Sequence, residues 1–419
     1  MTAIPPDTAD AAMSPIFQPT DADALTRAGH LKPAHGRRRE VSSHLLSEEY
    51  ISSSSGSEDT QIVPDLLVSP ETLIYLGWGQ QKAGEIWRRW REIKEAETED
   101  GREVIFEMEF LDFVLEKYVP EVNILNDREA SIEQMELWGL AAELINCIMA
   151  SEFEDVRATE TIQYWVRDTM SIRYLGLEGL QKNSARRDEK RRNGTNDGGS
   201  EIRAAVARAP SSTVPGHTIL FKAISSTRVG YLPDGSMDIE SLTNLPPTDF
   251  RGRVFAPLYF TSSLSVAKVY RDYARNRTSS PVLMIQMNVP NSFIEALPPY
   301  ICSFGDLWKQ IVYTCRGGNN LRGTMAKIHS HALIIAPIAK GDNDAISGLR
   351  DWREITLNNV MHVDGEEAIQ SCVSRVRRGV RTKRDQGLGY AIRARDYSLA
   401  DEFGVSSVKK KRTLECTIL

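Results

Sequence analysis

The sequence predicts an α+β protein, with a helical bundle in its N-terminal half and a mixed, split sheet in its C-terminal half. Apolar residues recur at helical spacing over residues 64–180, and short apolar runs of strand length follow over residues 216–395. The intervening residues 181–215 are polar, basic and rich in glycine, as is typical of a flexible linker. With tails at 1–63 and 396–419, these observations predict two folded domains in a chain of 419 residues.

The first tail, residues 1–63, is rich in Pro, Ser, Asp and Ala. This composition buries too little apolar surface to offset the entropy of the chain, so we expect disorder. The tail contains a basic cluster, Arg37-Arg38-Arg39, and an acidic serine tract, Ser52 to Asp59. The tract is either a kinase target or a solvated linker.

The helical pattern begins at Ser69-Pro70-Glu71, which combines an N-cap serine, a proline in the first turn and an acid near the positive helix end. Aromatic residues at helical spacing form a core more often than a ligand platform, but a partner could also bind in a groove beside Trp87 and Trp90. Four apolar stripes follow the start signal: Ile86, Trp87, Trp90 and Ile93; Phe106, Phe110, Phe113, Val114 and Tyr118; Met135, Trp138, Ala142, Ile145 and Met149; and Ile162, Trp165, Val166 and Met170.

The linker contains a run of basic residues, Arg186 to Arg192, followed by a glycine-rich polar stretch. The basic run is either a nuclear-import signal or a helix extension with a solvated, charged face.

The C-terminal domain is organised around a strand, a polar corner, a helix and a second strand. Val254 to Thr261 is an apolar, aromatic run that suits a buried strand. Ser262 or Ser263 is the expected N-cap of a helix, because apolar residues recur at helical spacing over residues 266–274. The alternating residues 282–289, closed by a proline, predict the second strand.

Three further elements complete this domain. Residues 218–224 (TILFKAI) and 332–338 (ALIIAPI) are of strand length, and residues 307–312 carry apolar side chains on one helical face. Long irregular insertions separate the strands, so we expect a split or mainly antiparallel sheet.

This order of elements resembles the ADP-ribosyltransferase fold, which includes diphtheria toxin and the poly(ADP-ribose) polymerases. The resemblance is carried by the strand TILFKAI, the strand end Tyr-Phe-Thr-Ser-Ser, the helix with Val-Ala-x-x-Tyr and the strand after it. The chain also resembles fungal proteins that join a helical N-terminal part to such a domain. The resemblance covers the central two-fifths of the chain.

The resemblance implies NAD as cofactor and a set of site residues. Lys222 would contact phosphate, and Tyr259 would stack on nicotinamide with Thr261, Ser262 and Ser263 beside it. The glutamate that stabilises the oxocarbenium-like sugar would be Glu366 or Glu367. Lys222 stands where the family has Arg or His, and lysine has neither the guanidinium fork nor a neutral ring acceptor. This departure leaves two alternatives open: an NAD-dependent ADP-ribosyltransferase that lacks the usual Arg or His, or a protein that binds NAD or a related nucleotide without turnover.

Two other reactive patterns have simpler interpretations. His329 and His331 would share a face of a strand and could bind a metal, but no Cys or carboxylate stands at matching spacing, so we predict no metal site. Cys315 beside Arg316 is either a thiol activated by the cation or a buried, inert cysteine. The five cysteines show no CxxC spacing, which favours a reducing compartment.

The last residues, Cys416-Thr417-Ile418-Leu419, fit a C-a-a-X pattern that favours geranylgeranylation of Cys416. Lys409, Lys410, Lys411 and Arg412 would supply the second signal, an attraction to an anionic membrane surface. Residues 370–419 contain twelve Lys or Arg and five Asp or Glu, a net of +7, which leaves −13 for the rest of a chain of net charge −6. The alternative is a frayed tail with a free thiol.

Composition excludes several classes of protein. The net charge of −6 argues against bulk nucleic-acid binding, although local patches can still be basic, and we predict no specific nucleic-acid partner. The first residues lack the pattern of a secretory signal, and no apolar run approaches the ~20 residues of a spanning helix.

Three hypotheses therefore describe the function. The first is a membrane-tethered, ADP-ribosyltransferase-like protein that binds NAD or a related nucleotide. The second is a lipid-anchored, non-enzymatic scaffold whose helical bundle recruits a protein partner. The third is a nuclear regulator that uses its basic clusters. The first two place the chain in the cytoplasm, on the cytoplasmic face of a membrane if it is prenylated, and the third places it in the nucleus.

Overall fold

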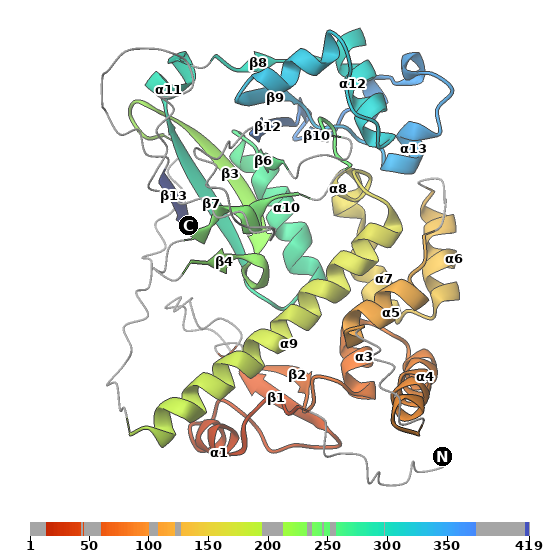
Figure 1. Cartoon of the computed structure of the whole chain (residues 1–419), viewed down its shortest axis with the longest axis vertical. Coiled ribbons are helices and arrows are strands. Elements are labelled where there is room, and N and C mark those ends of the chain that lie inside the picture. Colours follow the sequence, from red (N-terminus) through yellow and green to blue (C-terminus); the bar gives the residue numbers. More distant parts are fainter. Residues whose placement is uncertain are drawn as a thin grey trace.

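A computed structural model of the chain confirms a mixed α+β protein with small sheets. It describes residues 14–42, 45, 60–99, 108–121, 127–194, 213–232, 237–244, 247–251, 257–296, 298–373 and 415–418. Helices fill the first half and strands occur mainly in the second half (Figure 1). Within these residues, no helix is both long and apolar enough to cross a membrane.

The first half is built around one long helix, α9, against which α1, α3 and α5 pack (Figure 1). Its elements are α1 (Pro19–Arg27), β1 (Arg38–Ser42), β2 (Thr60–Pro64), α3 (Pro70–Leu76), α4 (Gln80–Glu99), α5 (Phe110–Tyr118), α6 (Arg128–Trp138), α7 (Ala142–Ile148), α8 (Glu154–Arg157) and α9 (Ile162–Arg192).

The helix start signal and the aromatic core are confirmed. The Ser69 side chain accepts from the Thr72 N–H and caps α3. Trp90 is buried and its ring contacts Phe110 and Phe113, with centroids 5.1 and 5.2 Å apart. Trp87 is partly buried and packs against the same core, and a partner site beside the two tryptophans stays a prediction.

Two expectations for the first half are wrong. The third apolar stripe forms two helices, because Gly139 adopts a left-handed conformation (φ 83°) that ends α6. Residues 14–42 were expected to be disordered but form α1 and β1, and Ile16 and Val41 are fully buried. A few apolar residues are enough to order this segment, because they are buried against elements from elsewhere in the chain. The segment does not need a hydrophobic core of its own.

The basic run of residues 186–192 is the last part of α9, which confirms the expected helix extension in this part of the expected linker, and nuclear import stays a prediction. Arg187 and Arg191 both pair with Asp21 of α1, which is completely buried. Although burial opposes it, these two arginines hold the pKa of Asp21 below its usual value. Residues 195–212 lie outside the described part of the chain.

The second half contains two main sheets that are split, as expected. Strands β13-β7-β3 are antiparallel, and strands β6-β12-β9-β8 are antiparallel except for the parallel pair β8–β9. One bridge, between Phe221 and Thr261, joins the two sheets. The elements are β3 (His217–Ser225), β4 (Gly230–Tyr231), β5 (Met237–Asp238), β6 (Leu258–Phe260), α10 (Leu264–Arg277), β7 (Val282–Pro290), α11 (Asn291–Ala296), β8 (Tyr300–Ile301), α12 (Asp306–Arg316), β9 (Leu333–Pro337), α13 (Asn343–Ser347), β10 (His362–Val363), β11 (Glu366–Glu367), β12 (Ile369–Val373) and β13 (Glu415–Ile418).

The two halves share a hydrophobic core. Val266 and Tyr273 of α10 belong to the same buried cluster as the N-terminal helices, and so do Met361 and Val363. Helix α10 therefore has two packing faces, because Ala267 contacts the β3–β7 sheet while Tyr273 packs against Trp165 of α9. The chain folds as one packed unit across the boundary that the sequence pattern predicts.

Candidate functional site

The residues expected to bind NAD lie close together where β3, β6 and α10 meet, and we name this set the Tyr259 corner (Lys222, Tyr259, Thr261, Ser262 and Ser263). The hydroxyl of Tyr259 donates to Thr248 Oγ1 at 2.8 Å and accepts from the Phe250 N–H at 3.2 Å. Its ring packs against the second buried cluster, and burial raises its pKa well above the usual value. Tyr259 is therefore a partner of the protein's own loop over residues 248–250.

The amine of Lys222 is also bonded within the protein. Lys222 Nζ donates to Asn244 Oδ1 at 2.9 Å and to the Tyr259 carbonyl at 3.3 Å. Burial, with a smaller contribution from Arg228, lowers the pKa of Lys222 to about 8. The lysine ties β3 to the neighbouring segments, which competes with a role in holding phosphate.

Two hydroxyl-bearing residues of the corner, Thr261 and Ser263, bond to the protein backbone, and the third, Ser262, is exposed to solvent. Thr261 Oγ1 donates to the Ile369 carbonyl at 2.7 Å, which ties β6 to the start of β12. Ser263 caps α10, since its Oγ accepts from the Val266 N–H at 3.3 Å. This confirms an N-cap at one of the two expected serines, and Ser262 is exposed.

The two candidate catalytic carboxylates are on a surface hairpin. Glu366 and Glu367 form β11, which pairs with β10 across a turn in which Asp364 and Gly365 have positive φ angles of 55° and 82°. Both glutamates are exposed, and neither is among the residues that line the cavity described below. The geometry gives neither of them the desolvated surroundings that a glycosyl-transfer carboxylate requires.

The reactive Cys and His patterns have structural roles. Burial raises the pKa of the Cys315 thiol to about 12, so the inert interpretation holds and thiol activation by Arg316 is wrong. His329 lies in a 3-10 turn rather than on a strand, and its Nε2 is 2.8 Å from the Phe250 carbonyl. Within the described residues, no group of three His, Cys, Asp or Glu side chains could hold a metal.

The expected tail site is only partly described. Lys409 to Arg412 lie outside the described residues, as does the serine tract over residues 52–59. Cys416 lies in β13, where it pairs with Met287 of β7. Prenylation of Cys416 stays a prediction.

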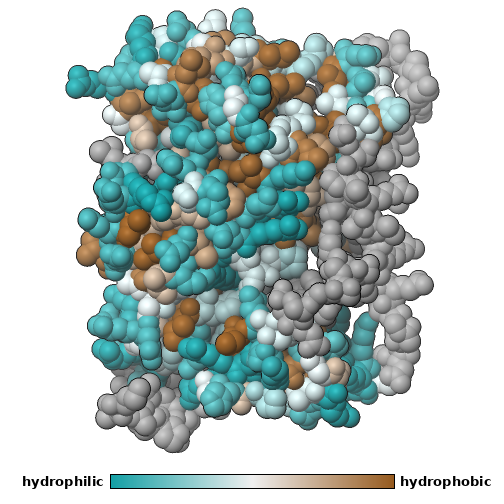
Figure 2. All heavy atoms as spheres, turned by 180° about the vertical axis from the view of Figure 1, so that it is seen from behind, coloured by the Kyte–Doolittle hydropathy of each residue, from teal (hydrophilic) through white to brown (hydrophobic). Residues whose placement is uncertain are grey.

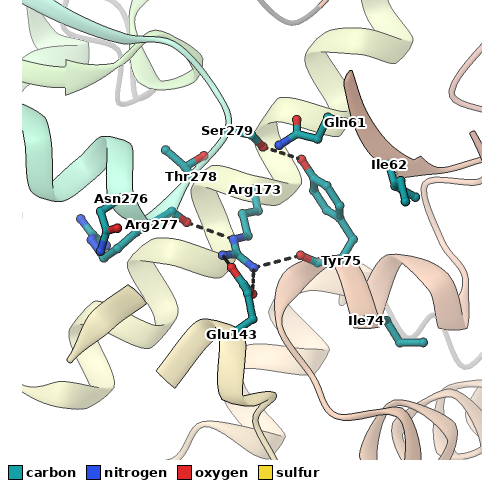
Figure 3. A pocket seen from close by; sticks show the side chains of 10 residues that line it. All are labelled: Gln61, Ile62, Ile74, Tyr75, Glu143, Arg173, Asn276, Arg277, Thr278 and Ser279. Atoms are coloured by element: carbon teal, nitrogen blue, oxygen red, sulfur yellow. Dashed lines mark hydrogen bonds and ion pairs between the residues drawn. The ribbon is translucent and has the colours of Figure 1, made fainter. Parts of the chain in front are cut away.

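A cavity of about 400 Å³ lies between the two halves of the chain (Figure 3), and no residue of the Tyr259 corner lines it. It is partly open to solvent, and its volume falls within the range of small-molecule sites. We name it the α3–α10 cavity. Its lining combines hydroxyl, amide and charged groups with two isoleucines: Gln61, Ile62, Ile74, Tyr75, Glu143, Arg173, Asn276, Arg277, Thr278 and Ser279.

Arg173 of α9 forms the floor of the α3–α10 cavity and binds three other segments at once (Figure 3). Its Nη1 and Nη2 donate to the two carboxylate oxygens of Glu143 at 3.1 and 2.7 Å. Its Nε donates to the Arg277 carbonyl at 3.0 Å, and its Nη1 also reaches the Tyr75 carbonyl at 3.2 Å. The guanidinium is thus neutralised and held in place before any ligand arrives.

The rim of the cavity carries hydrogen-bond acceptors. Tyr75 and Ser279 hydroxyls are 3.2 Å apart, and Gln61 lies beside them (Figure 3). The Oε1 atom of Gln61 is buried and has no hydrogen-bond partner among the described residues. Asn276 Nδ2 donates to the Cys147 carbonyl at 2.8 Å, and the oxygen of the same amide is an acceptor. The side chain of Glu143 is 59% exposed. The cavity therefore favours a ligand that supplies donors.

A second unusual feature is a buried charged cluster around Arg316 of α12. Arg316 Nε donates to Asp249 Oδ1 at 2.6 Å, and its Nη1 donates to the Thr159 carbonyl at 2.8 Å and lies 3.6 Å from Glu160 Oε1. Asp249 Oδ2 accepts from the Ala339 N–H at 3.0 Å. We name Arg316, Asp249 and Glu160 the Arg316 cluster.

Glu160 is an acidic member of this cluster with a strongly perturbed pKa. Its pKa is raised to about 7, mainly by burial; Arg316 opposes this rise, and Asp249, Asp342 and Asp168 add to it. Asp249 and Arg316 satisfy each other, whereas Glu160 is bonded weakly, at 3.6 Å. Perturbed carboxyl groups mark functional sites in many proteins, but buried ion-pair networks also produce them.

No match is found. Family models, curated proteins and solved structures were each compared with the chain, and none of the three comparisons identifies a similar protein.

Sequence reasoning missed the α3–α10 cavity because its residues come from five separate elements. Glu143 and Arg173 are thirty positions apart on different helices. One signal was available: residues 276–280 form a polar stretch between a predicted helix and a predicted strand, and such loops often carry binding residues.

Proposed function

We propose that this chain has an ADP-ribosyltransferase-like α+β part that does not transfer ADP-ribose, and that it binds an NAD-derived nucleoside in the α3–α10 cavity. The observation that carries the proposal is the acceptor-rich rim of this cavity, which includes Gln61 with its unpartnered Oε1. A ribose diol and a carboxamide supply the N–H and O–H donors that such a rim would satisfy.

The charges of the cavity favour the nucleoside end of the ligand over its phosphates. Arg173 is neutralised by Glu143, and the guanidinium of Arg277 is turned to Asp168 and Thr169, each at 2.8 Å. Among the described lining residues, both cations are therefore already paired. A pyrophosphate would gain little electrostatic attraction inside the cavity, so it would face the side that is open to solvent.

We expect no transfer of ADP-ribose because of the hydrogen bonds and the exposure of the expected catalytic residues. Lys222 and Tyr259 are bonded to the protein's own groups, and Glu366 and Glu367 are exposed on a hairpin. Transfer would need these groups to converge on one sugar, in a site from which water is excluded.

The test is calorimetric titration of nicotinamide riboside and of NAD into the full-length chain, with nicotinamide release measured in parallel. We expect the riboside to bind, NAD to bind no more tightly, and no nicotinamide to be released. Gln61→Met and Ser279→Ala should each weaken binding roughly ten-fold, which corresponds to about 1.4 kcal/mol.

Tyr259→Phe separates the cavity from the Tyr259 corner. Binding that is lost in Tyr259→Phe and unchanged in the two cavity variants would place the ligand at the corner instead. Release of nicotinamide would make the protein an enzyme, and absence of binding by either compound would remove the proposal.

A further inference from the structure

One end of the molecule carries a basic surface, although the whole chain is acidic. Residues 14–42 and 181–194 together contain eleven Lys or Arg and five Asp or Glu, a net charge of +6, whereas the chain of 419 residues has a net charge of −6. These residues form α1, β1 and the last part of α9, which lie together at the lower end of the molecule in Figure 1. We name this surface the basic end.

Helix α9 presents one side to α1 and another side to solvent at this end. Ser184 is buried and its Oγ accepts from the Gln18 N–H at 2.9 Å, and Arg187 pairs with the buried Asp21. Lys182, Arg186 and Lys190 are spaced four residues apart and are exposed. The fold thus fixes one side of the helix and leaves a straight basic stripe on another.

The stretch between α1 and β1 adds exposed cations. Arg27, Lys32 and Arg38 are exposed, and Leu31 between them is buried and fixes the stretch to the core. Gly36 and Arg37 turn the chain with φ angles of 57° and 64°. A left-handed conformation costs an arginine about 1–2 kcal/mol relative to its usual conformations. The backbone strain is thus located at the tip that carries the arginines.

The neighbouring acids do not cancel these charges. Lys182 pairs with Glu178 at 3.3 Å and Arg192 pairs with Asp188 at 2.5 Å, yet the two basic side chains are 72% and 69% exposed. The Lys182–Glu178 pair is largely exposed and contributes roughly 0–1 kcal/mol, so a phosphate can replace Glu178 at little cost, whereas Asp188 is buried and keeps Arg192 as its partner.

We infer that the basic end binds the phosphate backbone of a nucleic-acid duplex. Residues four apart rise about 6 Å along the axis of an α-helix. Two phosphates of one strand that are two steps apart rise about 6.8 Å along the axis of a duplex, which is close to this spacing. Arginine predominates among the exposed cations, and its planar fork suits phosphate. Hydrophilic residues also predominate on the rear of this end (Figure 2).

A lipid surface fits this end less well than a duplex. Of the large apolar side chains that are exposed in the described residues, none comes from residues 27–38 or 181–192. Ile62 of β2, opposite Glu40 of β1, is exposed next to this end, and one such side chain gives little insertion among acyl chains. Exposed aromatic side chains for stacking on unpaired bases are missing from the same two described segments, which favours a duplex over a single strand.

The experiment is fluorescence anisotropy with the full-length chain and labelled 20-base-pair duplexes of RNA and of DNA, at several salt concentrations. We expect the logarithm of the association constant to fall with the logarithm of the salt concentration, with a slope of about −0.9 per phosphate contacted. Arg38→Glu with Arg186→Glu should weaken binding at least ten-fold and make the slope shallower by about two contacts. The RNA and DNA arms show which duplex is preferred.

The matched control is Arg322→Glu with Arg350→Glu, which reverses two exposed charges away from the basic end. Thermal unfolding of both double variants checks that each is folded, and Arg38→Ala with Arg186→Ala replaces the charge reversal if it is not. An equal loss in the control, binding only to phosphatidylserine vesicles or polyglutamate, or no binding to either duplex would overturn the inference.

Discussion

The carboxyl group of Glu160 is largely buried, but it makes only a weak contact with its nearest cation. Only 24% of its side chain is exposed, and its nearest cation, Arg316, is already occupied by Asp249. Burial raises the pKa of Glu160 to about 7, whereas an unfolded glutamate titrates near 4.5. The folded state therefore holds a proton over a pH range in which the unfolded state releases it.

This difference links stability to pH. The contribution of Glu160 is fully present below the unfolded pKa of about 4.5 and is lost as the pH rises through 7. Glu160→Gln keeps the shape without the charge, so we expect it to be more stable than the parent at pH 8, by about 1–3 kcal/mol after allowance for partial exposure, and to differ little at pH 4.5. Urea denaturation at a series of pH values measures the difference.

The control for this variant is Glu152→Gln, which changes an exposed glutamate close by in the sequence. We expect it to leave the pH profile of stability unchanged. A parent and a Glu160→Gln variant with parallel profiles between pH 5 and pH 8 would contradict the assignment.

Single residues of the Tyr259 corner also show which structural features a sequence motif can predict. The pattern Tyr-Phe-Thr-Ser-Ser correctly predicted a strand end and a helix cap, because both depend on local backbone groups. It could not state where each hydroxyl points. Tyr259 bonds to Thr248 and Thr261 bonds to Ile369, and the second partner is more than a hundred residues away.

At the scale of elements, α10 connects the local pattern to the fold. Ser263 caps it, its inner residues contact the β3–β7 sheet, and Tyr273 near its end donates to the Ile148 carbonyl of α7 at 3.1 Å. Periodicity predicted the helix, but only packing gave it two buried faces.

The cap supplies a test at this scale. Ser263→Ala removes the acceptor for the Val266 N–H and should lower the free energy of unfolding by about 1 kcal/mol. Ser262→Ala changes the exposed neighbour and should have no measurable effect. Ser263→Asp should restore most of the loss, and denaturant midpoints report all three. Equal effects at the two serines would show that the cap does not stabilise the helix.

At the scale of the whole molecule, buried ion pairs join the two halves. Arg277 of α10 is 4% exposed, donates to Asp168 of α9 at 2.8 Å and lies over the rings of Trp165 and Tyr273. Arg228 pairs with the same Asp168 at 2.7 Å. Burial opposes ionisation, but the two arginines hold the pKa of Asp168 below its usual value. Each half therefore neutralises charges of the other.

Removing one partner should destabilise both halves together. Arg277→Met leaves Asp168 with one cation, and we expect a loss of about 3 kcal/mol, since a buried charge loses its partner. Arg271→Met on the same helix removes a partly exposed pair with Asp272 and should cost less than about 1 kcal/mol. Urea unfolding followed by tryptophan fluorescence and by limited proteolysis measures both variants. Separate transitions for the two halves would contradict a shared core.

Sequence by itself determined the elements whose causes are local. These elements follow from residues within a few positions of one another. They are the cap of α3, the run TILFKAI in β3, the cap and apolar stripe of α10, and the end of β7 at Pro290. The split, mostly antiparallel arrangement of strands also followed from their spacing.

Only the tertiary structure decided what these elements hold between them. Residues 14–42 are ordered because Asp21 meets Arg187 and Arg191, and Ile16 meets a distant core. The α3–α10 cavity and the Arg316 cluster exist because side chains from separate segments converge on them. Burial, ion pairing and pKa depend on distances between residues far apart in the chain, and periodicity contains no information about such distances.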